Sequence, residues 1–193
     1  MATHFTTLYG AQGVGFLVGD TDSTSASDRK AAVNDAYVQL ASIKGYWRKR
    51  TNAYTSSSSP ALTSGGQTVN VPSDFDSIYR LGYRQNGYWI PIEIVGDDEY
   101  LERSATSSSS AAYPSFARLF QTGSATRLEF DVSISATFLS QIGTITLEYF
   151  IIITRLSGDS DEPIIPENYR QYIKYLGAKL YAIGQGDDSL MRR

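Results

Sequence analysis

Residues 159–184 read DSDEPIIPENYRQYIKYLGAKLYAIG and join an acidic loop to a helix. The fixed φ of proline suits the start of a helix, so Pro166 predicts that this helix begins close to it. Behind Pro166, apolar and aromatic residues recur at steps of three and four, which is the spacing of one helix face. We expect this face to be buried against another element. It comprises Tyr169, Tyr172, Ile173, Leu176, Leu180 and Ile183.

The same helix contains small residues, namely Gly177, Ala178 and Gly184. A glycine inside a helix costs about 1 kcal/mol relative to alanine, but it allows another backbone to approach closely. We therefore expect a second helix to pack tightly against this one.

The composition is that of a globular chain. The 193 residues are 41% hydrophobic, which suits one domain or one domain with a large insertion. The net charge of −3 gives no general attraction to nucleic acid or to anionic membranes. The absence of cysteine excludes disulfides and thiolate metal sites and is typical of an intracellular or virion protein. The first residues, MATHFTTLYG, do not resemble a signal peptide, and no apolar run reaches the roughly 18 residues of a membrane span, so we expect a soluble protein without membrane contact.

Two helices are predicted near the N-terminus. The first covers residues 5–17 and ends at Gly19, although it contains three glycines. The second starts at a cap formed by Ser25 or Ser27 and ends near Gly45. Its apolar face is formed by Val33, Ala36, Tyr37, Leu40 and Ala41.

From residue 48 the sequence becomes rich in β-branched and aromatic residues, interrupted by serine-rich loops. Asn86 and Gly87 predict a hairpin, because a type I′ turn needs two residues with positive φ. A short helix is predicted over residues 97–104. The strand over residues 144–154 alternates at first and then becomes apolar on both faces, which predicts a central position in a sheet. The predicted strands are 67–71, 75–85, 88–95, 115–121, 126–133 and 144–154.

The predicted fold class is α+β. The N-terminal helices and the C-terminal helix form a small helical bundle, and an antiparallel β subdomain, either a barrel or a sandwich, is inserted between them. Within the single domain 1–193, the predicted parts are a helical collar at 1–47 and 159–186, a β subdomain at 48–156 and a flexible tail at 187–193.

The acidic residues of the loops do not form a recognisable metal site. An EF-hand register that starts at Asp20 or at Asp159 places Ala31 or Arg170 where a bidentate glutamate belongs. We interpret these carboxylates as charges at helix starts and as Asx turns. The glycines of GAQGVGFLVG match neither nucleotide-binding fingerprint, so no cofactor is predicted.

No catalytic residue is predicted. His4 is the only histidine, and no G-x-S-x-G motif accompanies it, which argues against a serine nucleophile. A carboxylate-based hydrolase remains a minor alternative. It would need an acid of the 97–102 segment (Asp97, Asp98, Glu99 or Glu102) to face Glu129 or Glu148 across a cleft, and sequence spacing does not decide this.

The only local basic cluster is formed by residues 47–50, WRKR, together with Arg192 and Arg193. An aromatic residue beside cations is able to stack on a base. We favour the simpler interpretation that these cations cover a helix C-terminus and the start of a strand.

The order of short motifs resembles the head-tail connector adaptor proteins of tailed bacteriophages, over residues 13–186. VPSDFD and DSDEPIIPENY are the most specific of these motifs. The full order is VGDTDS, NDAYVQLASIKGYWRKR, QTVNVPSDFDSIYRL, PIEIVGDDEYLER, TITLEYF and SDEPIIPENYRQYIKYLGAKLYA. The serine-rich loops are longer than in that family, and the first predicted helix is richer in glycine.

This resemblance implies a structural protein of the virion neck, assembled in the bacterial host cytoplasm as a homo-oligomeric ring, usually a dodecamer. The ring would dock on the portal protein above it and contact a tail, stopper or nozzle protein below it. Double-stranded DNA would pass through its channel without specific contacts. By resemblance, the C-terminal segment reaches into the portal. The portal-docking residues implied in this way are Ser189, Leu190, Met191, Arg192 and Arg193.

The helix stripe offers more aromatic residues than a bundle of three helices is able to bury, so we expect some of them at a subunit interface. The candidates are Tyr169, Tyr172, Tyr175 and Tyr181, with Tyr175 and Tyr181 favoured. The alternative function is a carbohydrate- or receptor-binding β module of a tail structure, supported by fourteen tyrosines and by the serine-rich loops. It predicts a sandwich without long helices.

Overall fold

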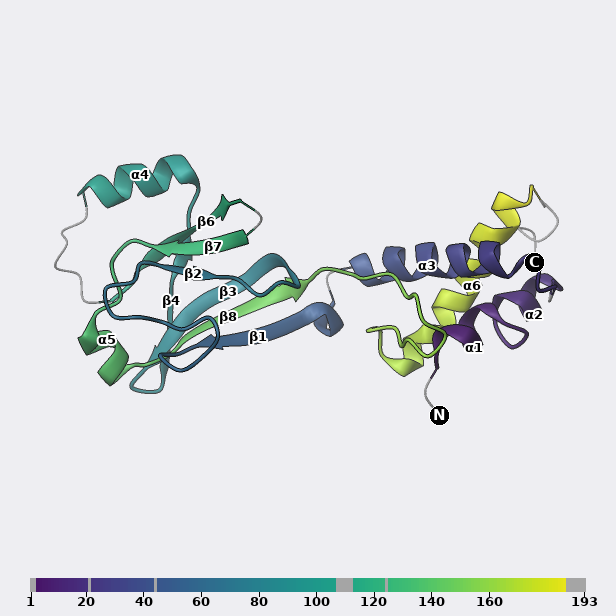
Figure 1. Ribbon diagram of the computed structural model, residues 1–193, viewed down its shortest axis with the longest axis horizontal. Helices are drawn as coiled ribbons and strands as arrows, with labels where there is room; N and C mark the ends of the chain where they lie inside the picture. The colour runs from purple at the N-terminus through teal and green to yellow at the C-terminus, as the bar shows by residue number, and fades with distance from the viewer. Residues whose placement is uncertain (1–2, 21, 44, 107–112, 124, 187–193) are drawn as a thin grey trace. The chain divides into compact units, whose positions relative to one another are not determined.

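A computed structural model describes residues 3–20, 22–43, 45–106, 113–123 and 125–186 of the chain. The chain divides into two compact units (Figure 1). The helical unit comprises Met1–Arg48 and Ile153–Arg193, and the β unit comprises Lys49–Ile152. The observed β unit begins and ends within a few residues of the predicted 48–156. The two units together give the α+β class that the sequence predicts.

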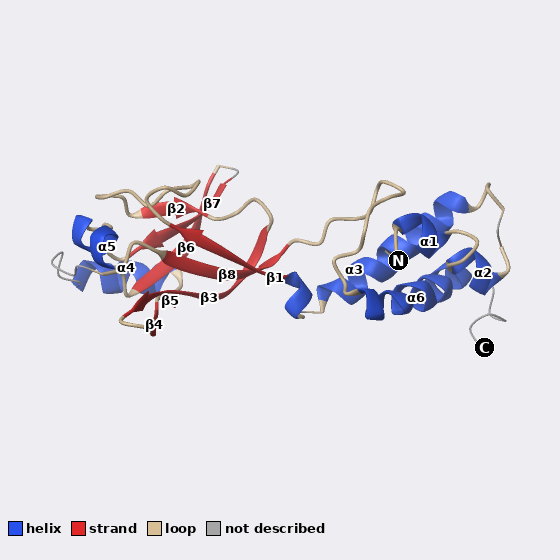
Figure 2. Cartoon of the chain, turned by 90° about the horizontal axis from the view of Figure 1, so that it is seen from below, coloured by secondary structure: helices blue, strands red, loops and turns tan. Residues whose placement is uncertain are grey.

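Two long helices, α3 and α6, form the centre of the helical unit and lie side by side (Figures 1 and 2). Two short helices precede them, and a 3-10 turn follows α3 and another precedes α6. The elements of the helical unit are α1 (Phe5–Tyr9), α2 (Val14–Val18), α3 (Ala26–Ser42), η1 (Tyr46–Arg48), η2 (Glu167–Tyr169) and α6 (Arg170–Gly184).

The prediction of one helix over residues 5–17 is wrong, because the chain turns sharply between α1 and α2. At Gly13 the backbone comes so close to the preceding turn that a Cβ would lie 1.9 Å from the carbonyl oxygen of Leu8. Only glycine permits this approach. Gly19 ends α2 in the left-handed conformation with φ of 70°, as the sequence predicts.

Gly177 is the place where α6 meets its neighbours, which confirms the predicted close packing. A Cβ at this position would lie 3.1 Å from Cγ2 of Val14 and 3.4 Å from Cγ2 of Val33. Ile173, one turn earlier, is fully buried. The expectation that the whole apolar stripe is buried is wrong, because three of its members lie at the surface. These are Tyr169, Tyr172 and Ile183.

The β unit contains two four-stranded sheets (Figure 2). The first sheet has the order β1 (Lys49–Tyr54), β8 (Ile145–Ile151), β3 (Phe75–Gln85) and β4 (Tyr88–Pro91). The second has the order β2 (Thr68–Asn70), β7 (Ala125–Phe130), β6 (Phe116–Thr122) and β5 (Glu93–Ile94). Two helices complete the unit, α4 (Asp97–Thr106) and α5 (Ala136–Gln141). In the described residues both sheets are open, with edge strands, and no closed barrel forms.

Two predictions for the sheets are confirmed. Asn86 and Gly87 have φ of 51° and 84° and join β3 to β4 in an antiparallel hairpin. Strand β8 lies between β1 and β3, in the predicted central position, and six of its seven residues are buried.

The predicted strand 88–95 is divided between the two sheets. The amide of Ile92 donates to the carbonyl oxygen of Leu81 at 2.9 Å, which continues the first hairpin. The next amide, that of Glu93, donates to Ser115 at 3.0 Å, and β5 pairs in parallel with β6. A single strand therefore changes sheets at this point. The inserted unit is consequently antiparallel except for this one pair of strands among those described.

Candidate functional site

An open apolar pocket lies at the start of α6, where the helical unit exposes several aromatic rings. The ring of Trp47 lies 6.1 Å from that of Tyr169, which in turn stacks at 6.4 Å on Tyr172. The pocket has a volume of about 140 Å³. We call it the aromatic pocket. Its lining residues are Leu40, Ile43, Trp47, Ile165, Tyr169 and Tyr172.

The rim of the aromatic pocket is exposed to solvent. Tyr169 is 42% exposed, Tyr172 is 52% exposed and Ile43 is 61% exposed. Tyr175, one turn further along α6, is 61% exposed but does not line the pocket. A cluster of exposed apolar side chains around a concavity is typical of a surface that binds another protein. Three of the four predicted interface tyrosines are thus accessible.

The fourth predicted interface residue, Tyr181, is an error of the sequence interpretation. Its side chain is buried inside the helical unit, and its hydroxyl donates a hydrogen bond to the carboxylate of Asp20. This bond from Tyr181 is the largest cause that lowers the pKa of Asp20. Arg29, which is also buried, lies 3.3 Å from the same carboxylate. Tyr181 therefore holds α6 to the loop after α2 and is not available to a neighbouring subunit.

The carboxylates of the two acidic loops have structural partners, as the sequence interpretation expects. Asp159 accepts hydrogen bonds from the hydroxyl of Tyr9 at 2.9 Å and from Nζ of Lys30 at 3.0 Å. Lys30 is the largest cause of the lowered pKa of Asp159, followed by Tyr9. Asp20 and Asp22 form Asx turns, because each accepts the backbone amide two residues further on. In the described residues no group of three or more acidic or histidine side chains is placed to hold a metal ion.

Arg170, at the start of α6, organises the acidic loop before the helix. Its guanidinium is buried and donates to the carbonyl oxygens of Ile165 and Pro163, both at 2.9 Å, and of Thr3 at 3.1 Å. It also lies 3.2 Å from the carboxylate of Glu167. The sequence interpretation missed this role. An arginine in the first turn of a helix, where positive charge is disfavoured, was the available signal.

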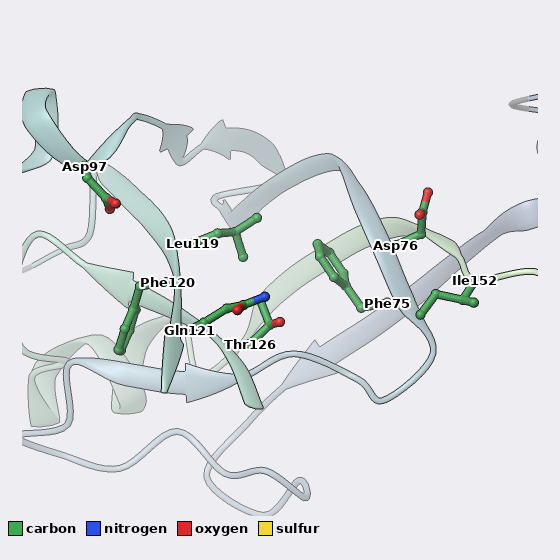
Figure 3. A pocket seen from close by; sticks show the side chains of 8 residues that line it. All are labelled: Phe75, Asp76, Asp97, Leu119, Phe120, Gln121, Thr126 and Ile152. Carbon is green, nitrogen blue, oxygen red and sulfur yellow. The ribbon is translucent and has the colours of Figure 1, made fainter. Parts of the chain in front are cut away.

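A larger cleft of about 740 Å³ lies in the β unit (Figure 3). Figure 3 shows Phe75 from β3, Leu119 and Phe120 from β6, and Thr126 from β7 around it. Asp97 from the start of α4 also faces this space. The remaining lining residues are Asp76, Gln121 and Ile152. The cleft combines aromatic rings with carboxylates and an amide, the mixture that small polar ligands use.

The carboxylates that a hydrolase would require are occupied by cations. Glu148 lies 2.8 Å from Nζ of Lys49 and also binds Arg80. Glu129 lies 2.6 Å from Nη2 of Arg118, whose Nη1 lies 3.3 Å from Asp97. Arg118 therefore lies between Asp97 and Glu129 and forms an ion pair with each of them.

Two cations of the basic cluster at residues 47–50 have partners within the chain. Arg48 is buried and donates to the carbonyl oxygen of Ser42, the last residue of α3, at 3.2 Å. Lys49 pairs with Glu148. This arrangement confirms that these cations cover a helix end and a strand start. Arg192 and Arg193, with the other predicted docking residues Ser189, Leu190 and Met191, lie outside the described residues.

Comparison of the chain with protein-family models and with curated proteins found no match. None of the helices in the described part of the chain has the length and apolar character that a membrane span requires.

Proposed function

We propose that the protein is a structural subunit of a tailed-phage virion that assembles into a ring at the head-tail junction. The ring docks on the portal protein, contacts a tail-side protein and forms a conduit for DNA. The observation that carries the proposal is the aromatic pocket. The helical unit leaves Ile43, Tyr169 and Tyr172 exposed around a concave apolar surface, which is the kind of surface that subunit contacts cover.

Two further observations support a structural role. The order of motifs resembles connector adaptors along most of the chain. The chain divides into a helical unit formed by both of its ends and an inserted β unit, as the pattern of helices and strands predicts. A weakly acidic chain also suits a conduit, because each phosphate neutralised by Lys or Arg would add affinity and slow the passage of DNA.

The experiment is electron microscopy of the purified full-length protein mixed with the portal protein of the same phage. We expect a ring stacked on the portal. A variant that ends at residue 188 removes the implied docking segment and is expected to co-sediment less with portal rings. A protein that stays monomeric and does not contact portal would contradict the proposal.

The cleft of the β unit supports a second candidate function, the binding of a carbohydrate or another polar receptor group. Phe75 and Phe120 offer faces for sugar rings, and Asp76 and Gln121 offer hydrogen-bonding groups. For this alternative the sequence analysis predicts a sandwich without long helices, and α3 and α6 contradict that fold. A glycan array probed with the protein and with Phe120→Ala tests the remaining version. Glycan binding that the substitution abolishes would support it, and binding that the substitution does not change would locate the site elsewhere.

A further inference from the structure

A second exposed apolar site lies on the short helix α2 of the helical unit. Val14 is buried and Val18 packs against the helical core, so these two residues form the inner side of α2. Phe16 and Leu17 lie on the outer side and are 72% and 37% exposed. The helix is therefore apolar on both sides, although only one side is covered within the helical unit.

A single exposed apolar side chain is common in soluble proteins and has little meaning alone. Phe16 differs because the same unit offers a pocket of matching size and chemistry. The aromatic pocket has a volume of about 140 Å³. Cavities of about 150 Å³ lined by leucine, isoleucine and phenylalanine side chains bind benzene, which has the size of a phenylalanine ring. The lining of the aromatic pocket is likewise apolar and aromatic.

Phe16 is unable to reach the pocket of its own copy. Helix α2 packs beside the second half of α6, because Val14 lies against Gly177 and the loop after α2 meets Tyr181. The pocket lies at the other end of α6, beside Tyr169. Eight residues of helix separate positions 169 and 177, which is about 12 Å at 1.5 Å per residue. This distance exceeds the reach of a phenylalanine side chain.

We propose that Phe16 of one copy inserts into the aromatic pocket of a neighbouring copy. The two surfaces differ, so the contact is heterologous: each copy offers a projecting ring to one neighbour and a pocket to the other. Repetition of such a contact closes into a ring when the rotation between copies permits. The proposal specifies the contact between subunits of the proposed ring. It rests on the proposed function only in that copies of the protein must associate with one another. It assigns the residues on the two sides of the ring interface.

The first test uses disulfide cross-linking of full-length protein, because the natural chain has no cysteine to interfere. Protein carrying Phe16→Cys is mixed with protein carrying Ile43→Cys, at the pocket rim, and oxidised mildly. We expect a covalent dimer that needs both variants. The matched control is Tyr175→Cys, which is as exposed as Ile43 but does not line the pocket, and it should give little dimer with Phe16→Cys.

The cross-linking is carried out on concentrated protein alone and on the mixture with portal. Absence of the selective dimer in both samples overturns the proposal. Rings on the portal without this cross-link would overturn the interface and leave the proposed function standing. A selective cross-link without rings would support the interface and contradict the role at the portal.

The second test measures self-association by analytical ultracentrifugation. Phe16→Ser removes the projecting ring from an exposed position, so the helical circular dichroism signal should be unchanged. Loss of one buried phenylalanine should weaken association about 10-fold to 100-fold. Tyr175→Ser is the control and should change association by less than about threefold, since it lies outside the pocket. If the unmodified protein self-associates, equal association of Phe16→Ser would overturn the proposal.

Discussion

At the residue scale, the buried side chain of Arg170 connects separate segments of the helical unit. The guanidinium of Arg170 satisfies the carbonyl oxygens of Thr3, Pro163 and Ile165, which belong to segments far apart in the sequence. Buried carbonyl groups without a donor are costly. Arg170 therefore fixes the conformation of the loop that leads into α6, and with it Ile165 and Tyr169 of the aromatic pocket.

Substitution Arg170→Met should lower the free energy of unfolding of the helical unit by about 2–4 kcal/mol, because it leaves buried carbonyl groups unpaired. Trp47 reports on this unit when the only other tryptophan is removed by Trp89→Phe. Urea unfolding followed by Trp47 fluorescence measures the change. The control, Arg84→Met, removes an exposed arginine of the β unit and should shift the curve by less than about 0.5 kcal/mol. Equal shifts in the two variants would contradict the role of Arg170.

The β unit also contains a buried charged residue, Glu148. Its side chain is only 10% exposed, and its hydrogen bond with Arg80 is the largest cause that lowers its pKa below the ordinary 4.5. A carboxyl group whose pKa is lower in the folded state stabilises the fold fully above the unfolded pKa. This contribution is lost as pH falls from 4.5 through the folded pKa.

Glu148→Gln should therefore lower stability by about 1–3 kcal/mol at pH 7, the size of charge-assisted hydrogen bonds. The difference from the unmodified protein should shrink as pH falls below 4.5, because the protonated acid then resembles the amide. Thermal unfolding at pH 7 and at several values below 4.5 measures this. A difference that stays constant over the whole range would show that the pair does not contribute through the charge of Glu148.

At the element scale, the sequence predicts best where one local rule decides the structure. Asn86 and Gly87 adopt the positive φ values that the turn requires. Strand β8 takes the central position that the apolar residues of segment 144–154 predict. Gly177 marks the contact between α6 and its neighbours. Each of these features depends on a short run of residues and on general sterics.

Other elements could not be predicted because their residues carry no periodic signal. Strand β1 reads KRTNAY and buries only Tyr54, since it is an edge strand, and the sequence interpretation assigned no strand to it. Helix α5 has six residues with one buried side chain, Phe138, and is too short for a helical period. The change of sheet after Ile92 depends on hydrogen bonds to Ser115, a distant residue.

The aromatic pocket was predictable only in part, because residues from distant segments form it. Tyr169, Tyr172 and Tyr175 are exposed as the interface prediction requires. The aromatic pocket, which Tyr169 and Tyr172 line, also needs Ile43 and Ile165, which come from other segments. Their proximity follows from the packing of α3 against α6, which the helix stripe alone does not specify.

The packing of α6 leads to a prediction about two glycines of the same helix. Gly177→Leu should lower the free energy of unfolding by about 1–3 kcal/mol, because its side chain would collide with Val14 and Val33. Gly184→Leu is the matched control, since nothing lies within 4 Å of a Cβ at that position. It should be neutral or slightly stabilising through helix propensity. Urea unfolding followed by Trp47 fluorescence compares them, and equal effects would exclude close packing at Gly177.

At the scale of the whole molecule, the β unit has the features of an inserted domain. Its first residue, Lys49, pairs with Phe150 near the end of β8, so the chain enters and leaves this unit on neighbouring antiparallel strands. It also has buried residues of its own. Examples are Leu81, Leu128, Phe130, Phe138, Ile145 and Leu147. A unit with adjacent ends and its own core has what it needs to fold alone.

Residues 49–152 expressed alone should therefore unfold cooperatively, with Trp89 as the only tryptophan and the fluorescence reporter. Its unfolding midpoint in urea should match the Trp89 transition of the full-length protein carrying Trp47→Phe, because the unit has its own paired strands and its own buried residues. The helical unit is different, since α3 and α6 come from opposite sides of the insertion and residues 1–48 alone lack α6. The fragment 1–48 should consequently show little cooperative unfolding. A fragment 49–152 without a cooperative transition would mean that the β unit depends on the helical unit for its stability.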